Sequence, residues 1–136
     1  MLAKELVTKK AKVEFIYSDI LVEEALEKVE KKRYMMIPVL ERGSNRYLYS
    51  LSEGDLLRFI CSVGSLRKAM KSPLTSVAIE RLIIPVREDA ESDAIFDLIV
   101  NQNYVPVIDG NGVFQGIATR RAMLNALRPQ STEEGE

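Results

Sequence analysis

Two short stretches of the sequence place hydrophilic side chains where an apolar run gives way to a helical pattern. The first is Ser52-Glu53-Gly54-Asp55, and the second is Thr119-Arg120-Arg121-Ala122. In each, a hydroxyl can cap the helix, while the free N–H groups of the first turn favour an anion. Arg120 and Arg121 add paired donors that suit phosphate oxygens, whereas the Asp55 carboxylate is an acceptor that suits a ribose diol. The two turns therefore predict an anion-weighted site and a ribose-weighted site.

The absence of one residue type excludes several kinds of chemistry. The sequence has no histidine, which excludes Ser-His-Asp and Cys-His catalysis, His-ligated metals and imidazole general bases. No pair of carboxylates lies in an apolar setting that would shift a pKa for acid–base catalysis. We therefore expect a protein that is not an enzyme and has no catalytic residues, metal or cofactor.

Composition limits the class of protein further. A chain of 136 residues with 46% hydrophobic side chains fits one compact domain, and a net charge of −1 does not favour a general nucleic-acid binder. No apolar stretch has membrane-spanning length. The single cysteine, Cys61, allows no intramolecular disulfide and lies in an apolar helical pattern, so we expect it to be buried. These features predict a cytoplasmic protein without a nucleic-acid or membrane partner.

The apolar pattern shows that the chain is a direct repeat. A β-rich run at 13–17 precedes a helical face at 22–29, strands are predicted at 34–40 and 46–51, and a helix begins near Ser52. The same order returns after residue 80, with Pro106 opposite Pro38. We predict an α+β (mixed α/β) fold of two βαββα copies. The first spans 1–62, a connector with a short helix spans 63–80, the second copy spans 81–128, and a disordered acidic tail spans 129–136.

The repeated segments resemble the CBS domain family, arranged as a tandem pair called a Bateman module. The most specific stretches are IPVLERGSNRYLYSLSEGDLL and YVPVIDGNGVFQGIATRRAML, each with an apolar-Pro-Val step, a turn, and the Ser or Thr described above. The resemblance covers about residues 10–127. Within the family, the sequence is most similar to small stand-alone CBS proteins of bacteria, including the cyclic-di-AMP-binding kind called DarB or CbpB.

The resemblance implies two clefts between the copies, each built from both of them and suited to an adenine nucleotide. The first cleft would combine one set of residues from the first copy with the second turn: Lys12, Glu14, Tyr34, Met35, Met36 and Ile37 with Thr119, Arg120 and Arg121. The second cleft would combine residues of the second copy with the first turn: Ile83, Ile84, Tyr104 and Val105 with Ser52 and Asp55. It also implies a homodimer formed through the CBS helices, and signalling to a regulated protein whose identity is unknown.

Two departures from the family pattern keep a second function open. Ala122 occupies the position of the turn aspartate in the second copy, and Tyr49 occupies a position where the family often has glycine. Ser52 and Asp55 can also act only as a helix cap in which each side chain satisfies a backbone donor. The leading hypothesis is thus a nucleotide-sensing regulatory module, and the alternative is a ligand-free interaction or oligomerisation domain.

Overall fold

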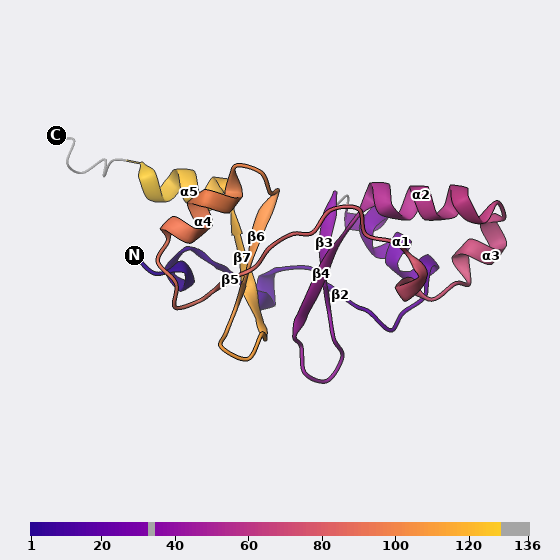
Figure 1. Ribbon diagram of the computed structural model, residues 1–136, viewed down its shortest axis with the longest axis horizontal. Coiled ribbons are helices and arrows are strands. Elements are labelled where there is room, and N and C mark those ends of the chain that lie inside the picture. The colour runs from indigo at the N-terminus through magenta and orange to yellow at the C-terminus, as the bar shows by residue number, and fades with distance from the viewer. Residues whose placement is uncertain (33–34, 129–136) are drawn as a thin grey trace.

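The computed structural model describes residues 1–32 and 35–128, which fold into two repeats (Figure 1). The first contains β2 (Ile16–Tyr17), α1 (Val22–Lys32), β3 (Met36–Leu40), β4 (Tyr47–Ser52) and α2 (Glu53–Val63). The second contains β5 (Val86–Arg87), α4 (Asp93–Ile99), β6 (Tyr104–Ile108), β7 (Phe114–Thr119) and α5 (Arg120–Leu127). The predicted α+β class and the repeated βαββα order are both confirmed.

The strands of both repeats meet in the middle of the molecule, and the helices lie toward its two ends (Figure 1). In the first sheet β2 runs parallel to β3, and β3 runs antiparallel to β4. The second sheet repeats this arrangement with β5, β6 and β7. Pro38 and Pro106 each lie one residue before the point where β2 or β5 joins, so a missing N–H breaks no bond to that neighbour.

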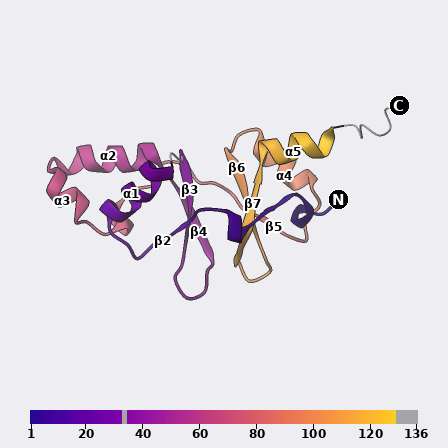
Figure 2. The same cartoon turned by 180° about the vertical axis from the view of Figure 1, so that it is seen from behind.

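The N-terminal segment crosses from the second repeat to the first (Figure 2). Its elements are the 3-10 helix η1 (Ala3–Leu6), strand β1 (Thr8–Lys9) and the 3-10 turn η2 (Lys10–Lys12). Strand β1 pairs antiparallel with β7, with Lys9 opposite Gly116. Gly116 has a φ of +150°, and a Cβ there would collide with the carbonyl oxygen of Thr8. Glycine is therefore required at this position because the added strand lies directly against it.

The connector packs against the first repeat as the N-terminal segment packs against the second. It contains α3 (Leu66–Met70), the short helix predicted before Pro73, and the 3-10 turn η3 (Leu74–Ser76). Leu74 and Val77 enter the apolar core of the first repeat, just as Ala3 and Leu6 enter the core of the second. Each core is thus completed by a segment that leads into the first strand of the other repeat.

The tips of the two hairpins join the repeats through a reciprocal pair of backbone hydrogen bonds. The N–H of Tyr47 donates to Gly112 O at 3.0 Å, and the N–H of Phe114 donates to Asn45 O at 2.9 Å. Between them Arg46 and Val113 form an antiparallel bridge. These reciprocal bonds relate the two repeats by an approximate two-fold axis. The turns that begin at Ser52 and Thr119 therefore occupy equivalent positions.

Some local predictions were wrong. Cys61 is exposed, because it lies on the outward face of α2. Leu124, which the helical pattern predicts as a core residue, is 67% exposed on α5. The β-rich run at 13–17 shortens to β2 because only its last two residues pair with β3, and the first strand of the second copy is limited to Val86 and Arg87, which pair with β6.

Among residues 1–32 and 35–128, no helix is both long and apolar enough to cross a bilayer. The predicted acidic tail at 129–136 lies outside the described residues.

Candidate ligand-binding site

A cavity of about 210 Å³ lies between the two repeats at the end of β7. It brings together four of the residues predicted for the first cleft, which are Lys12, Glu14, Met36 and Thr119. The remaining lining residues are Thr8, Val13, Pro38, Tyr104 and Ile117. Tyr104 was predicted for the other cleft, so its ring is the main difference between the expected and the observed lining.

The sequence contained a signal for two of the lining residues that the prediction missed. Pro38 follows Met36 by two positions on β3, and Ile117 precedes Thr119 by two positions on β7. Side chains two apart on a strand share one face, so each missed residue accompanies a predicted one. Thr8 carried no such signal, since it reaches the cavity through the added strand β1.

The cavity is lined by both apolar and polar residues. Val13, Met36, Pro38 and Ile117 supply the apolar surface, and the Tyr104 ring adds a flat aromatic one. The Thr119 hydroxyl accepts a hydrogen bond from Ala122 N at 3.1 Å and caps α5. The exposed Lys12 adds a cation, while Glu14 lies 3.3 Å from the ammonium of Lys28. A flat apolar group with an anionic end fits this arrangement.

The two arginines of the second turn lie outside this cavity. The Nε of Arg120 donates to Ile99 O at 3.2 Å, which turns its guanidinium toward α4. Arg121 lies beside Leu124, Asn125 and Arg128 on the outer side of α5. Both side chains are exposed. Their predicted role in holding phosphate therefore stays a prediction, and it requires each guanidinium to leave the position seen here.

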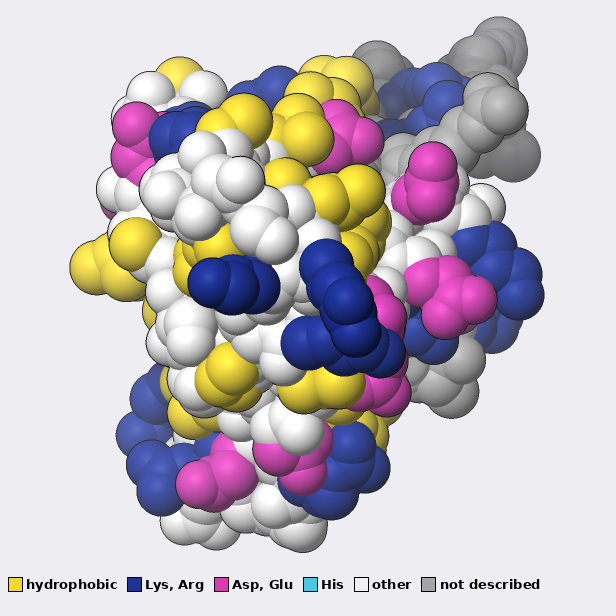
Figure 3. Space-filling view, turned by 90° about the vertical axis from the view of Figure 1, so that its right-hand side faces the viewer, with side chains coloured by type: hydrophobic (Ala, Val, Ile, Leu, Met, Phe, Trp, Pro, Cys, Tyr) yellow, Lys and Arg dark blue, Asp and Glu magenta, His cyan; other side chains and the backbone are white. Residues whose placement is uncertain are grey.

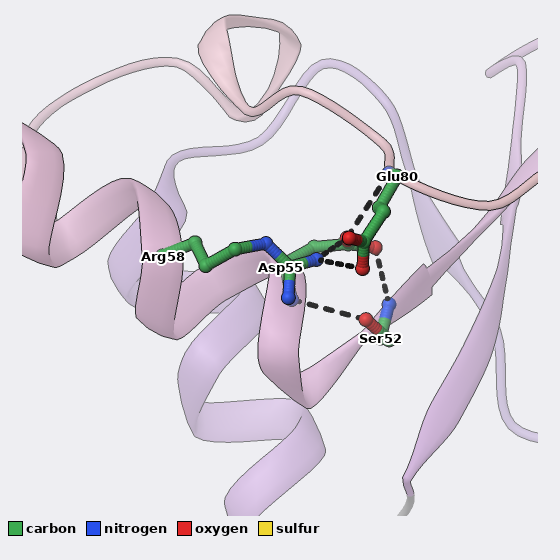
Figure 4. A network of polar contacts seen from close by, with 4 residues as sticks. All are labelled: Ser52, Asp55, Arg58 and Glu80. Atoms are coloured by element: carbon green, nitrogen blue, oxygen red, sulfur yellow. Dashed lines mark hydrogen bonds and ion pairs between the residues drawn. The ribbon is translucent and has the colours of Figure 1, made fainter.

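The first turn is closed by its own contacts (Figure 4). Asp55 is only 3% exposed and accepts from Ser52 N at 3.0 Å, while Asp55 N donates to the Ser52 hydroxyl at 3.0 Å. The other carboxylate oxygen accepts from Arg58 Nη2 at 2.5 Å and from Glu80 N at 3.2 Å. Arg58 also pairs with the Glu80 carboxylate at 3.1 Å. Both carboxylate oxygens are thus engaged within the protein, which favours the capping interpretation of this turn.

The other residues predicted for the second cleft do not line the cavity described beside Asp55. A cavity of about 350 Å³ beside Asp55 is lined by Arg58, Phe59, Ser62, Ser76 and Ala78, from α2 and the connector. Ile83, Tyr104 and Val105 are buried, and Ile84 is about half-exposed. In the first set, Ile37 is buried in the core, Met35 is 70% exposed, and Tyr34 lies outside the described residues.

The end of the molecule that carries α2 and α3 shows no single continuous charged patch (Figure 3). Basic, acidic and apolar side chains alternate on the face in view, and Lys71 of the connector pairs with Glu23 at 3.0 Å. Among the described residues, no group of three or more acidic or cysteine side chains could hold a metal ion.

The sequence profile of the CBS domain matches twice, at residues 3–62 and 70–129. The chain belongs to the CBS domain family. The second match begins within the segment treated above as the connector. Together the two CBS domains occupy nearly the whole sequence.

Several solved structures share the fold of the whole CBS pair. CbpB in complex with c-di-AMP is 19% identical over 93% of this chain and 84% of its own, with a TM-score of 0.83. A hypothetical conserved protein from Geobacillus kaustophilus is 26% identical over 93% and 96%, with a TM-score of 0.82. CBSX2 in complex with AMP is 22% identical over 92% and 94%, with a TM-score of 0.71. No curated protein matches the sequence.

Proposed function

We propose that this CBS pair is a regulatory module that binds an adenine nucleotide in the cavity between the repeats and signals to another protein. The observation that carries the proposal is the juxtaposition of apolar walls with Lys12 and the Thr119 cap of α5 in one cavity. An adenine ring would lie against Met36 and Tyr104, and its phosphate would lie at Lys12 and the first turn of α5. The complexes of CbpB with c-di-AMP and of CBSX2 with AMP support this choice of ligand class.

The size of the cavity suggests which part of the ligand it encloses. At about 210 Å³ it is smaller than the roughly 300–1,000 Å³ of typical small-molecule sites. A base and part of a ribose fit inside, and the phosphate extends to the exposed Lys12 at the rim. Lys12 lines the cavity, so its ammonium is the group that would neutralise the phosphate there.

Thermal melts with AMP, ATP and cyclic di-AMP test the proposal. A nucleotide at a hundredfold excess over its dissociation constant adds about 2.7 kcal/mol of apparent stability. We expect at least one of the three to raise Tm in the parent protein and less so in Lys12→Ala. Lys68→Ala, which removes an exposed lysine on the distant α3, is the matched control. The proposal is wrong if no nucleotide raises Tm.

The alternative function is a CBS pair that serves assembly without a ligand. It is favoured by the engaged carboxylate of Asp55 and by an apolar groove of about 290 Å³ between α4 and α5. The groove is lined by Phe96, Ile99, Val100, Met123, Leu124 and Leu127, with Arg120 at its edge.

We propose a homodimer under either function, because the groove and the exposed Leu57 of α2 leave apolar surface that association would bury. Light scattering at high micromolar concentration checks this. A dimer mass that falls to the monomer mass in Leu124→Glu supports it, and a monomer mass in the parent protein removes it. A cytoplasmic location, where adenine nucleotides are present, completes the proposed function.

A further inference from the structure

Three hydroxyl groups, two of them buried and that of Tyr47 partly buried, connect the cavity wall to the end of the connector. The hydroxyl of Tyr104 lies 2.6 Å from the Ser50 hydroxyl, which lies 2.9 Å from the hydroxyl of Tyr47. Tyr47 in turn donates to the carbonyl oxygen of Ile83 at 2.9 Å. Ser50 is fully buried and Tyr104 is 7% exposed, so the bond between these two hydroxyl groups is shielded from water.

The direction of this hydrogen-bond chain follows from counting its protons. A carbonyl oxygen only accepts, so the single hydroxyl proton of Tyr47 is committed to Ile83. Ser50 must then donate to Tyr47, and Tyr104 must donate to Ser50. The chain thus runs one way from the cavity wall, through β4 of the first repeat, to the connector.

A second route joins the same two places through the side-chain amide of Gln102. Its Oε1 accepts from Ile84 N at 2.7 Å, and its Nε2 donates to Ile84 O at 3.1 Å and to Tyr104 O at 3.2 Å. Gln102 is 5% exposed. The amide therefore holds both backbone groups of Ile84, which lies ahead of β5 and outside any strand.

These contacts make one closed circuit around the end of the connector. The Tyr104 ring lines the cavity, its hydroxyl reaches Ile83 through Ser50 and Tyr47, and its carbonyl reaches Ile84 through Gln102. Upstream, Glu80 N is held by Asp55. The connector has no sheet pairing between Glu80 and Ile84, so side chains supply its fixed points.

We propose that Tyr104 couples occupancy of the cavity to residues 80–84, which continue the connector toward β5, through the Ser50–Tyr47 hydroxyl chain and the Gln102 amide. The coupling rests on the proposed function, since it requires a nucleotide against the Tyr104 ring. A nucleotide that restricts the ring also restricts both routes, and the connector amides open less often. The connector is thus the part of the molecule whose mobility reports the bound state to a partner.

Hydrogen–deuterium exchange of the connector tests the coupling, with AMP and cyclic di-AMP as probes. In the parent protein, nucleotide should slow exchange at Ile84 N–H by about fivefold, the effect of one hydrogen bond. Tyr104→Phe keeps the ring and removes only the hydroxyl, so most of the added protection should disappear when the variant is compared with the parent protein at equal occupancy, set from affinities measured by calorimetry. Tyr47→Phe, at the other end of the chain, should lose the same protection. Tyr49→Phe on the same strand is the control and should behave like the parent protein.

The free protein supplies a readout that needs no ligand. Tyr104→Phe and Tyr47→Phe should each speed exchange at Ile84 N–H, and Tyr49→Phe should not. If nucleotide binds but connector exchange does not change, the proposed function stands and the coupling is wrong. If Tyr104→Phe retains full protection with nucleotide bound, the coupling is also wrong. If neither probe binds, the proposed function and the coupling fall together.

Discussion

The two turns that cap α2 and α5 share a backbone geometry but differ in what their side chains contact. The CBS matches begin at residues 3 and 70, so equivalent positions lie 67 apart. Ser52 corresponds to Thr119, and each hydroxyl accepts from the N–H three residues later. The three charged residues around the first turn, Asp55, Arg58 and Glu80, correspond to Ala122, Asn125 and Val13. Every member of the charged network therefore has a neutral counterpart at the second turn.

This difference explains why the cavity between the two repeats lies at the second turn, whereas the cavity beside Asp55 is formed by α2 and the connector. At the first turn, the connector is drawn onto the helix cap by the bond from Glu80 N to Asp55 and by the pair between Arg58 and Glu80. At the second turn, Val13 offers no carboxylate, and both it and Thr119 line the open cavity. The first turn fixes the connector to α2, and the second turn leaves its groups free to contact a ligand. A duplicated motif can thus divide structural and binding roles between its copies.

The largest expected effect is the loss of stability in Asp55→Ala. The substitution removes a buried carboxylate and leaves Ser52 N, Glu80 N and the Arg58 guanidinium without their acceptor. We expect the free energy of unfolding to fall by roughly 2–4 kcal/mol in urea titrations. Thr119→Ala, which removes only a cap, should cost about 1 kcal/mol. Equal losses in the two variants would contradict the division between the turns.

The next effect concerns affinity at the second turn. Lys12→Ala should weaken nucleotide binding by roughly 1.5–3 kcal/mol, about ten- to a hundredfold, because it removes a charge-assisted contact to phosphate. The sequence alone predicts the same loss for Arg120→Ala or Arg121→Ala. The guanidinium of Arg120 lies against Ile99 O, so we expect less than about threefold for Arg120→Ala in calorimetry. A loss for Arg120→Ala as large as that for Lys12→Ala would show that the arginine turns into the cavity on binding.

The repeat was readable in the sequence because its signals are local. Apolar spacing indicated each helix, and the hydroxyl at Ser52 or Thr119 marked where two of them begin. The contacts that engage both carboxylate oxygens of Asp55 were harder to predict from the sequence. Ser52 and Asp55 suggested a cap, but Glu80 lies 25 residues beyond Asp55, and only the path of the connector brings its N–H to the carboxylate. Likewise, the wall formed by Tyr104 depends on how the two sheets face each other, which no short-range pattern encodes.

Tyrosine ionisation provides a test, with a smaller expected effect, of the contacts that Tyr47 and Tyr104 make beside the cavity. Burial raises the pKa of Tyr47 to about 12, although its hydrogen bond with Ser50 acts in the opposite direction. Burial likewise raises the pKa of Tyr104. Because an unfolded tyrosine ionises near pH 10, the stabilising effect is complete below that pH and is lost as pH rises toward about 12. Between about pH 9 and pH 11, the raised pKa of Tyr47 should lower the free energy of unfolding by about 1 kcal/mol. Tyr47→Phe should remove that part of the pH dependence in urea titrations.

The smallest expected effect comes from restoring the missing acid in Ala122→Asp. The new carboxylate would stand three residues after Thr119, where it could accept the Thr119 N–H as Asp55 accepts that of Ser52. It would also place a negative charge in the first turn of α5, which now holds Arg120 and Arg121. We expect about 0.5–1 kcal/mol of added stability in urea titrations, well short of what Asp55 contributes, because Asn125 and Val13 supply no partner like Arg58 or Glu80. Ala122→Asn separates the two causes, since it can cap without charge. A gain in Ala122→Asp as large as the loss in Asp55→Ala would mean that the cap alone, and not the connector contacts, makes the first turn strong.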